Sequence, residues 1–127
     1  MKLIDVIKDL SLKIYPGELF CIVGGNGTGK STTLSLLSGI RKPYRGSVKI
    51  KGKKTSVLGT SVGMLPQNPQ SLFVADVVRD DLKECCDDPA KIQTVAELVR
   101  IGHLLDNHPY DLSGGEQQRV ALAKVLL

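Results

Sequence analysis

The sequence of 127 residues predicts one α/β domain that is built around a glycine-rich loop. Its length is that of a single ordinary domain. The apolar segment 19–23 leads directly into glycine-rich residues 24–31, and a helical pattern follows over 32–38. Beyond residue 70 the spacing of the apolar residues changes from the strand period of two to the helical period. We therefore expect extended segments in the first half and helices in the second.

Four segments have the patterns of β-strands. Residues 10–14 and 47–50 alternate apolar and polar side chains, as half-buried strands do. Residues 19–23 are apolar throughout, which predicts a strand covered on both faces. Residues 62–65 predict a short fourth strand, and the polar segment 53–60 predicts a hairpin loop.

The first two predicted helices are delimited by residues that cap or terminate helices. Gly39 occupies the position at which a C′ glycine ends the helix over 32–38. The next helix is expected to begin at Asp76, an N-cap residue type. Its buried face is predicted to comprise Val74, Val77, Val78 and Leu82.

Two more helices are predicted in the C-terminal part. Asp88 and Pro89 are an N-cap aspartate followed by proline at N1, and Gly102 is expected to end that helix. The last helix should begin after Ser113, because Ser113 and Glu116 have the spacing of a capping box.

Composition excludes several functional classes. The formal net charge is only +4, which favours a solvated face of scattered Lys and Arg over a dedicated anionic partner. No segment has the roughly 18 to 20 apolar residues that cross a bilayer, and charges interrupt the apolar residues at the N-terminus, unlike a signal peptide. The three cysteines lack C-x-x-C spacing, so reduced cytoplasmic thiols are expected.

The glycine-rich residues 24–31 spell GGNGTGKS, the complete G-x-x-x-x-G-K-S pattern. Glycines allow backbone N–H groups to approach a phosphate, and the following helix N-terminus adds positive potential. Lys30 can reach the outer phosphates and the Ser31 hydroxyl can hold Mg²⁺. The strand-loop-helix context favours a nucleotide-phosphate site over a chance match in a surface loop.

A second glycine-containing motif, LSGGEQQR, lies at 112–119. One interpretation is a well-capped helix. However, glycines at the first two helical positions cost roughly 1 kcal/mol each relative to alanine. A sequence that keeps them is expected to need exposed amides at this helix end, as a second anion site does.

With these motifs in this order, and with LPQNPQ around Gln67, the chain resembles the ATP-binding cassette (ABC) family, the ATPase subunits of ABC transporters. The resemblance covers almost the whole chain. It implies a P-loop NTPase fold of the ABC ATPase type, with an N-terminal antiparallel β part, a phosphate-loop core and a helical subdomain. Within the family, residues 67–82 look like the ATPases of energy-coupling-factor importers of vitamins and metal ions.

The resemblance also implies a division into three parts. Residues 1–71 would form the nucleotide-binding core with the β subdomain, the phosphate loop and the Q-loop. Residues 72–112 would form the helical subdomain. Residues 113–127 would form the signature helix, named after the LSGGEQQR motif at 112–119, which is the signature of the family. Family members continue into a strand with a Mg²⁺-binding aspartate and a catalytic glutamate, and later a switch histidine. We therefore expect a partial domain that lacks the hydrolytic residues and is inactive alone.

Two histidines and one tyrosine lie outside the positions that the family uses. His103 and His108 precede the signature, so they are expected to be solvent-facing loop residues and not the switch histidine. Tyr15 lies too close to the phosphate-loop strand to be the aromatic residue that stacks on adenine.

The resemblance implies ATP and Mg²⁺ as cofactors and assigns a role to each motif residue. Lys30 would contact the β- and γ-phosphates, Ser31 would ligate Mg²⁺, and Thr32 would contact the α-phosphate. Gln67 would sense the γ-phosphate through Mg²⁺ and water and link the site to the membrane subunit. The residues expected to wrap the phosphates are Gly24, Gly25, Asn26, Gly27, Thr28 and Gly29, and those that act in trans, from a second copy, are Ser113, Gly114 and Gly115.

The implied function is that of an ATP-binding subunit of an ABC-type transporter, an ATPase that couples ATP binding and hydrolysis in a domain dimer to import. Its expected partners are a second ABC ATPase domain and integral membrane subunits, without nucleic acid, at the cytoplasmic face of the cell membrane. Only 80 residues separate Ser31 from Leu112, which excludes the long coiled coil of DNA-repair and chromosome ATPases. A soluble ABC-type ATPase acting on the ribosome and a non-hydrolysing nucleotide-binding scaffold stay as alternatives.

Overall fold

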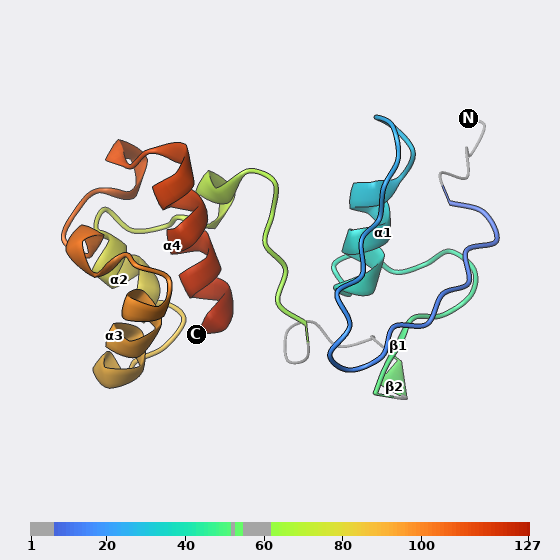
Figure 1. The fold of residues 1–127 in the computed structure, drawn as a ribbon, viewed down its shortest axis with the longest axis horizontal. Helices are drawn as coiled ribbons and strands as arrows, with labels where there is room; N and C mark the ends of the chain where they lie inside the picture. The colour runs from blue at the N-terminus through green and yellow to red at the C-terminus, as the bar shows by residue number, and fades with distance from the viewer. Residues whose placement is uncertain (1–6, 52, 55–61) are drawn as a thin grey trace. The chain divides into compact units, whose positions relative to one another are not determined.

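A computed structural model describes residues 7–51, 53–54 and 62–127 (Figure 1). The chain divides into two compact units, residues 1–62 and residues 63–127, and each is described by itself. The division into parts at residues 71 and 112 stays a prediction.

Helix α1, Lys30–Leu37, follows the glycine-rich loop and confirms the helix expected over 32–38, with its start two residues earlier. Its N-cap is Gly29, at φ +88°. Gly39, at φ +81°, has the left-handed conformation of a C′ residue and confirms the expected helix end.

The described part of residues 1–62 contains one pair of strands, β1 at Lys49–Ile50 and β2 at Lys53–Lys54. They pair in antiparallel register, with Lys49 opposite Lys54 and Ile50 opposite Lys53. The strand predicted over 47–50 is thus shorter than expected. The loop predicted over 53–60 is wrong at its first two residues, which are strand, and its residues 55–60 lie outside the described ones.

The predicted strands over 10–14, 19–23 and 62–65 are wrong, since the structure has no strand in them. Leu19 and Val23, expected to be buried on both faces, are 94% and 89% exposed. A strand is stabilised by hydrogen bonds to a neighbouring backbone and by layers that cover its faces. No described strand pairs with these residues, and an apolar pattern alone does not supply a partner.

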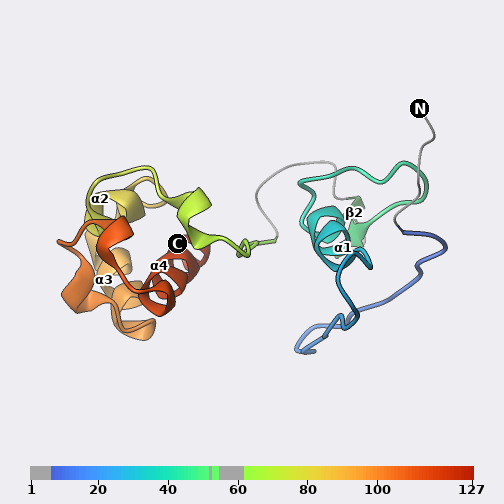
Figure 2. The ribbon, with the colours of Figure 1, turned by 90° about the horizontal axis from the view of Figure 1, so that it is seen from above.

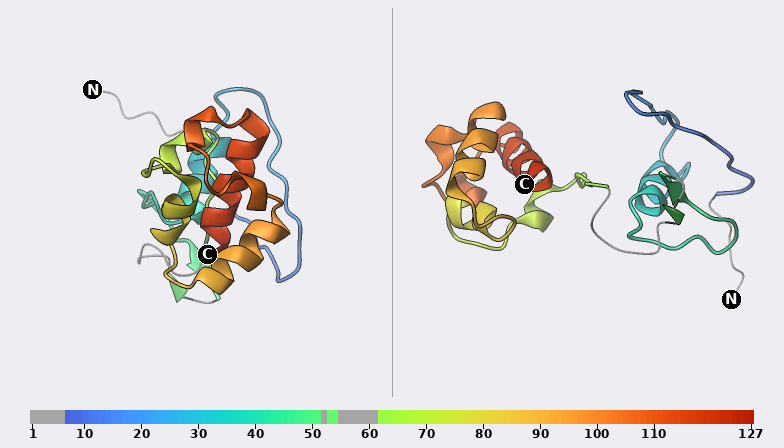
Figure 3. Two further views of the ribbon diagram at one scale, coloured as in Figure 1. Left: turned by 90° about the vertical axis from the view of Figure 1, so that its left-hand side faces the viewer. Right: turned by 90° about the horizontal axis from the view of Figure 1, so that it is seen from below.

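Residues 63–127 form a helical unit with a core of its own (Figures 1, 2 and 3). Its elements are η1 Pro69–Leu72, α2 Val78–Lys83, α3 Pro89–Leu98, η2 Gly102–Leu104, η3 Pro109–Asp111 and α4 Gly114–Leu126. Helix α4 packs against two other helices, α2 and α3, and against two short 3-10 turns, η1 and η3. The third 3-10 turn, η2, packs against α3.

The start of α2 differs from the prediction. Its N-cap is Val77, which makes no side-chain cap, so the Asp76 cap is wrong. The amides of Val78 and Arg79 instead donate to the carbonyls of Asn107 (3.0 Å) and Leu105 (2.8 Å). Carbonyls from a distant segment thus satisfy the helix N-terminus, and no capping side chain is needed. Of the four predicted core residues, Val78 and Leu82 are fully buried, Val77 is half-buried and Val74 is 74% exposed.

Helix α3 confirms the predicted start, because the Asp88 carboxylate accepts from the amides of Ala90 (2.9 Å) and Lys91 (3.3 Å). Its predicted end at Gly102 is wrong. The helix ends at Leu98, and a left-handed residue, Arg100 at φ +60°, reverses the chain.

This turn is a Schellman motif. The Arg100 amide donates to the Glu97 carbonyl (3.1 Å), and the Ile101 amide donates to the Ala96 carbonyl (2.8 Å). Ile101 is fully buried beside the helix. The left-handed residue that terminates α3 is therefore Arg100, two residues before the glycine that the sequence offered.

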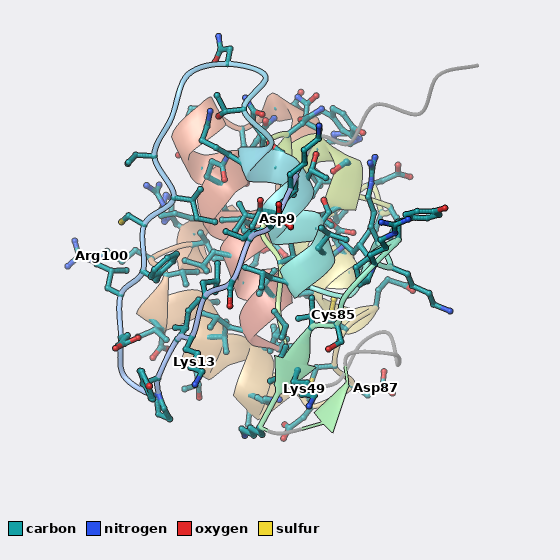
Figure 4. The ribbon with its side chains drawn as sticks, turned by 90° about the vertical axis from the view of Figure 1, so that its right-hand side faces the viewer. Asp9, Lys13, Lys49, Cys85, Asp87 and Arg100 are labelled. Carbon is teal, nitrogen blue, oxygen red and sulfur yellow. The ribbon has the colours of Figure 1, made fainter. Side chains whose placement is uncertain are left out.

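We expect Arg100→Gly to raise the free energy of unfolding by about 0.5 to 1 kcal/mol, because glycine adopts the left-handed conformation without strain at Cβ. The exposed Arg100 side chain points outward, so little packing is lost (Figure 4). Urea unfolding of this chain, followed by circular dichroism, measures the change. Arg100→Ala is the matched control, since it removes the charge but keeps Cβ; stabilisation by alanine as large as that by glycine would contradict the explanation.

Candidate functional site

Residues 24–29 form a closed loop that leads into α1. The Thr28 hydroxyl donates to the Gly25 carbonyl at 2.9 Å. Gly27 has φ +80°, a conformation that residues with a side chain rarely adopt. A Cβ at Gly24 would lie 2.8 Å from the Thr28 hydroxyl oxygen. Two of the loop glycines are therefore required by the backbone conformation or by close approach.

Lys30 lies at the first position of α1, and its side chain turns back onto the loop. Its Nζ atom donates to the carbonyls of Gly24 at 2.9 Å and Gly25 at 2.5 Å. The ammonium group is thus placed beside the backbone of the glycine-rich loop. To bind a phosphate, it would exchange carbonyl oxygens for phosphate oxygens.

The backbone amides of residues 24–32 donate no hydrogen bond to any described residue. The first amide at this helix end with an acceptor is that of Thr33, which donates to the Gly29 carbonyl at 2.8 Å. Free amides, the α1 N-terminus and the Lys30 ammonium provide hydrogen-bond donors and positive potential in one place. The arrangement fits an anion of several oxygens, such as a polyphosphate.

Two hydroxyl residues at the start of α1 differ in their surroundings. Ser31 is exposed, as a residue that contacts a bound cation must be. Thr33 is buried, and its hydroxyl also donates to the Gly29 carbonyl, at 2.9 Å. Thr33 therefore fixes the loop-to-helix junction, a role that the sequence reasoning missed. Its spacing of four residues from the N-cap glycine was the available signal.

An open hollow of about 480 Å³ adjoins the loop. Thr28, Lys30 and Thr33 line it, together with mostly apolar side chains from residues 7–12 and 20–23. The hollow therefore combines a cation with an apolar wall.

Gln67 and the signature residues belong to the other unit, residues 63–127. The Gln118 side-chain amide on α4 donates to the Gln67 carbonyl at 3.4 Å, and the Gln70 side-chain amide donates to Gln117 Oε1 at 3.3 Å. The segment that carries Gln67 thus lies along α4 (Figure 1). The exposed Gln67 side chain remains accessible to a ligand.

The N-terminus of α4 confirms the predicted capping box. The Glu116 carboxylate accepts from the Ser113 amide at 2.9 Å and from the Ser113 hydroxyl at 2.6 Å, and the Glu116 amide donates to Ser113 Oγ at 3.4 Å. Cβ atoms built at Gly114 and Gly115 would meet no atom within 4 Å. The glycines therefore leave this helix end open, while the serine hydroxyl is engaged.

The structure thus groups the predicted site residues in two sets. Residues 24–32 are together at the start of α1, and Gln67 lies on the same unit as Ser113, Gly114 and Gly115. Both histidines are exposed, as expected. His103 is not a helix cap. His108 is one, because its Nδ1 atom accepts from the Tyr110 amide at 3.2 Å and caps η3.

Other chemistry is limited in the described residues. Over 7–51, 53–54 and 62–127, no three His, Cys, Asp or Glu side chains are grouped so that they could hold a metal ion. Burial raises the pKa of the Cys85 thiol above its ordinary 9.0, against the opposing effect of Lys124. The described helices are also too short or too polar for any of them to cross a membrane.

The sequence pattern of the ABC transporter family matches residues 7–127. The chain belongs to this family. It is 40% identical, over 97% of its length, to the energy-coupling factor transporter ATP-binding protein EcfA1 of Mycoplasma genitalium. It is 39% identical, over 95% of its length, to the EcfA1 protein of Halalkalibacterium halodurans. It spans about half the length of these relatives, 50% and 49%.

A solved structure agrees with this assignment. CbiO1 from Clostridium perfringens, described as part of the ABC transporter complex cbiONQ, has a TM-score of 0.69 and 28% identity to this chain. The match covers 82% of this chain and 47% of CbiO1. The fold is therefore that of a P-loop NTPase of the ABC ATPase type, present in part.

The capping box predicts a pH dependence. The Ser113 hydroxyl, and next its amide, hold the pKa of the Glu116 carboxyl below its ordinary 4.5. Ionised Glu116 therefore stabilises the folded helix end above about pH 4.5, and this contribution is lost as the pH falls through the lowered pKa. Glu116→Gln should lower the urea midpoint near neutral pH and have a smaller effect near about pH 3. If the difference in urea midpoint between wild type and Glu116→Gln instead grew on acidification, this explanation of the pH dependence would be contradicted.

Proposed function

We propose that this chain is the nucleotide-binding part of an ABC-type transport ATPase that couples ATP binding and hydrolysis to import. The main observation behind this proposal is the closed glycine loop, with Lys30 folded onto it and with the amides of residues 24–32 donating to no acceptor in the described part of the chain. The proposal is further supported by the relatives, which are named as energy-coupling factor transporter ATP-binding proteins. Because the relatives so named are transporter proteins, we do not carry the ribosome-acting alternative forward.

In this proposal ATP and Mg²⁺ are the cofactors. Residues 24–29 wrap the phosphates through their amides, Lys30 neutralises the outer phosphates, and Thr32 contacts the α-phosphate. Ser31 and Gln67 contribute oxygens to Mg²⁺. In this class of reaction the bound metal ion neutralises charge on the transferred phosphate, while the protein positions and stabilises the reacting groups.

We also propose that a second ABC ATPase domain completes the site. The two units have opposite formal charges. Residues 1–62 contain 11 Lys and Arg against 3 Asp and Glu, a charge of +8, whereas residues 63–127 contain 6 against 10, a charge of −4. This asymmetry favours a contact in which the loop unit of one copy faces the signature unit of another. Ser113, Gly114 and Gly115 would then bind the γ-phosphate of ATP in trans.

The remaining partners are integral membrane subunits of the transporter, which would hold this chain at the cytoplasmic face of the cell membrane. The names of the relatives and of the CbiO1 structure support this part of the proposal.

Removing the loop ammonium tests the phosphate site. In the full-length protein, Lys30→Ala should weaken ATP binding about 10- to 100-fold, the loss expected for charged hydrogen bonds. Equilibrium titration with a fluorescent ATP analogue measures it. Lys42→Ala is the matched control, since Lys42 is exposed on the same unit and should leave affinity unchanged. Equal affinities for wild type and Lys30→Ala would refute the assignment.

A separate substitution in the signature tests whether a second ABC ATPase domain completes the site. Gly115→Asp should abolish ATP-dependent dimerisation of the full-length protein, because a carboxylate there repels the γ-phosphate. Aspartate is favourable at a helix N-terminus and has open space here, so folding should survive. Analytical ultracentrifugation with and without ATP measures dimerisation, and Gly102→Asp, also in open space, is the control. Intact ATP-dependent dimers of Gly115→Asp would exclude the in-trans role.

A further inference from the structure

One carboxylate is buried inside residues 63–127 with only half of its oxygens satisfied. Asp81 on α2 is fully buried. Its Oδ1 atom accepts from the Val74 amide at 2.9 Å and from Lys124 Nζ at 2.7 Å. Its Oδ2 atom is buried and has no hydrogen-bond partner. No other buried side-chain nitrogen or oxygen in the described residues lacks one.

Lys124 approaches this carboxylate from α4. Its side chain is 8% exposed, and Nζ also donates to the Leu72 carbonyl. The ion pair thus holds the short segment 72–74 at two of its backbone groups, the carbonyl of Leu72 and the amide of Val74. Both bonds involve a charged group, and such bonds are about twice as strong as neutral ones. We call Asp81 and Lys124 together the buried pair.

The segment that the buried pair holds continues directly to Gln67. Between them is the single turn η1, which the Asn68 side chain caps by accepting from the Gln70 amide at 3.1 Å. The Ser71 hydroxyl closes the same turn by donating to the Asn68 carbonyl at 2.8 Å. These two hydrogen bonds restrict how far one end of the turn can move relative to the other. Gln67 is thus connected to the buried pair by a short, hydrogen-bonded piece of chain.

The other polar attachments of this segment to α4 are weaker. They are the neutral hydrogen bonds from Gln118 to Gln67 and from Gln70 to Gln117, at 3.4 and 3.3 Å. Removing the buried pair would therefore leave these two long neutral hydrogen bonds as the polar contacts to α4, beside the apolar packing of Pro69 and Phe73. The pair is the strongest polar connection between the Gln67 segment and the helix that starts at Ser113.

A stabilising role alone does not account for this geometry. Buried ion pairs contribute little net stability, and well-packed apolar replacements are often as stable or more so. The orphaned Oδ2 atom adds a desolvation cost. The pair is better explained by the position that it imposes on residues 67–74.

We propose that Asp81 and Lys124 are positioning residues that lock the Gln67 segment to the signature helix. A displacement of Gln67 then moves the α4 end that carries Ser113, Gly114 and Gly115, and a displacement of that helix end moves Gln67. This inference rests on the proposed function, because under that function Gln67 and the signature residues Ser113, Gly114 and Gly115 act on the same kind of ligand, ATP with Mg²⁺. The buried pair itself touches no ligand and acts through Gln67.

The test replaces both charges at once in the full-length protein, as Asp81→Leu with Lys124→Met, so that no buried charge is left unpaired. Amide hydrogen exchange of peptides within 67–77 should become at least tenfold faster, while exchange within α3 stays unchanged. With its membrane partners, the double variant should lose at least fivefold in kcat for ATP hydrolysis and keep its KM within twofold. The control is Arg79→Gln with Asp106→Asn, which removes an exposed ion pair of 3.0 Å and should change neither readout.

A Gln67→Ala background separates positioning from a general structural effect. If the pair acts through Gln67, adding the double substitution there should lower kcat less than twofold further. A full fivefold further loss, or unchanged exchange over 67–77, would overturn the proposal. If the protein binds no ATP, the proposed function fails while the exchange result still tests the lock. If the double variant does not fold, Asp81→Asn takes its place. Amide hydrogen exchange over 67–77 should then accelerate by less than tenfold, and unchanged exchange would overturn the proposal.

Discussion

Helix α4 buries Val120, Ala121 and Ala123 completely, and the other helices of residues 63–127 depend on that face. Two of the three are alanines, and small side chains let neighbouring elements approach closely. The same closeness is seen where the chain first meets α4, since a Cβ at Gly63 would collide with Val125. The unit therefore places the Gln67 segment, α2 and α3 around one helix, and the orientation of that helix decides where the signature residues point.

The two glycine-containing helix ends are chemically similar but differ in readiness to bind an anion. At α1, the amides of residues 24–32 have no acceptor among the described residues, so a polyphosphate would add hydrogen bonds without displacing any between amides. At α4, the Ser113 hydroxyl already donates to the Glu116 carboxylate. A phosphate at Ser113 must therefore compete with Glu116, which makes the signature end the weaker site by itself.

Local capping was predictable because its chemistry lies within a few residues. The Asp88 cap, the Ser113–Glu116 box and the Gly39 helix end each use groups one turn apart, and all three are confirmed. The failures lie where a distant or less obvious group replaced the local one. The carbonyls of Leu105 and Asn107 cap α2 in place of Asp76, and Arg100 ends α3 before Gly102 because Ile101 is drawn into the core.

By itself the sequence determined the glycine-rich loop, the signature and their order, and these motifs identified the family, because phosphate-binding residues must occupy fixed spacings on contiguous chain. It did not determine strands: the apolar run 19–23 has a strand pattern, yet pairing requires a second backbone that the pattern cannot specify. Only the tertiary structure brought Asp81 to Lys124, 43 residues away, and showed one carboxylate oxygen without a partner. In sequence Asp81 is one of several aspartates in a polar stretch, and only packing decides which of them is buried.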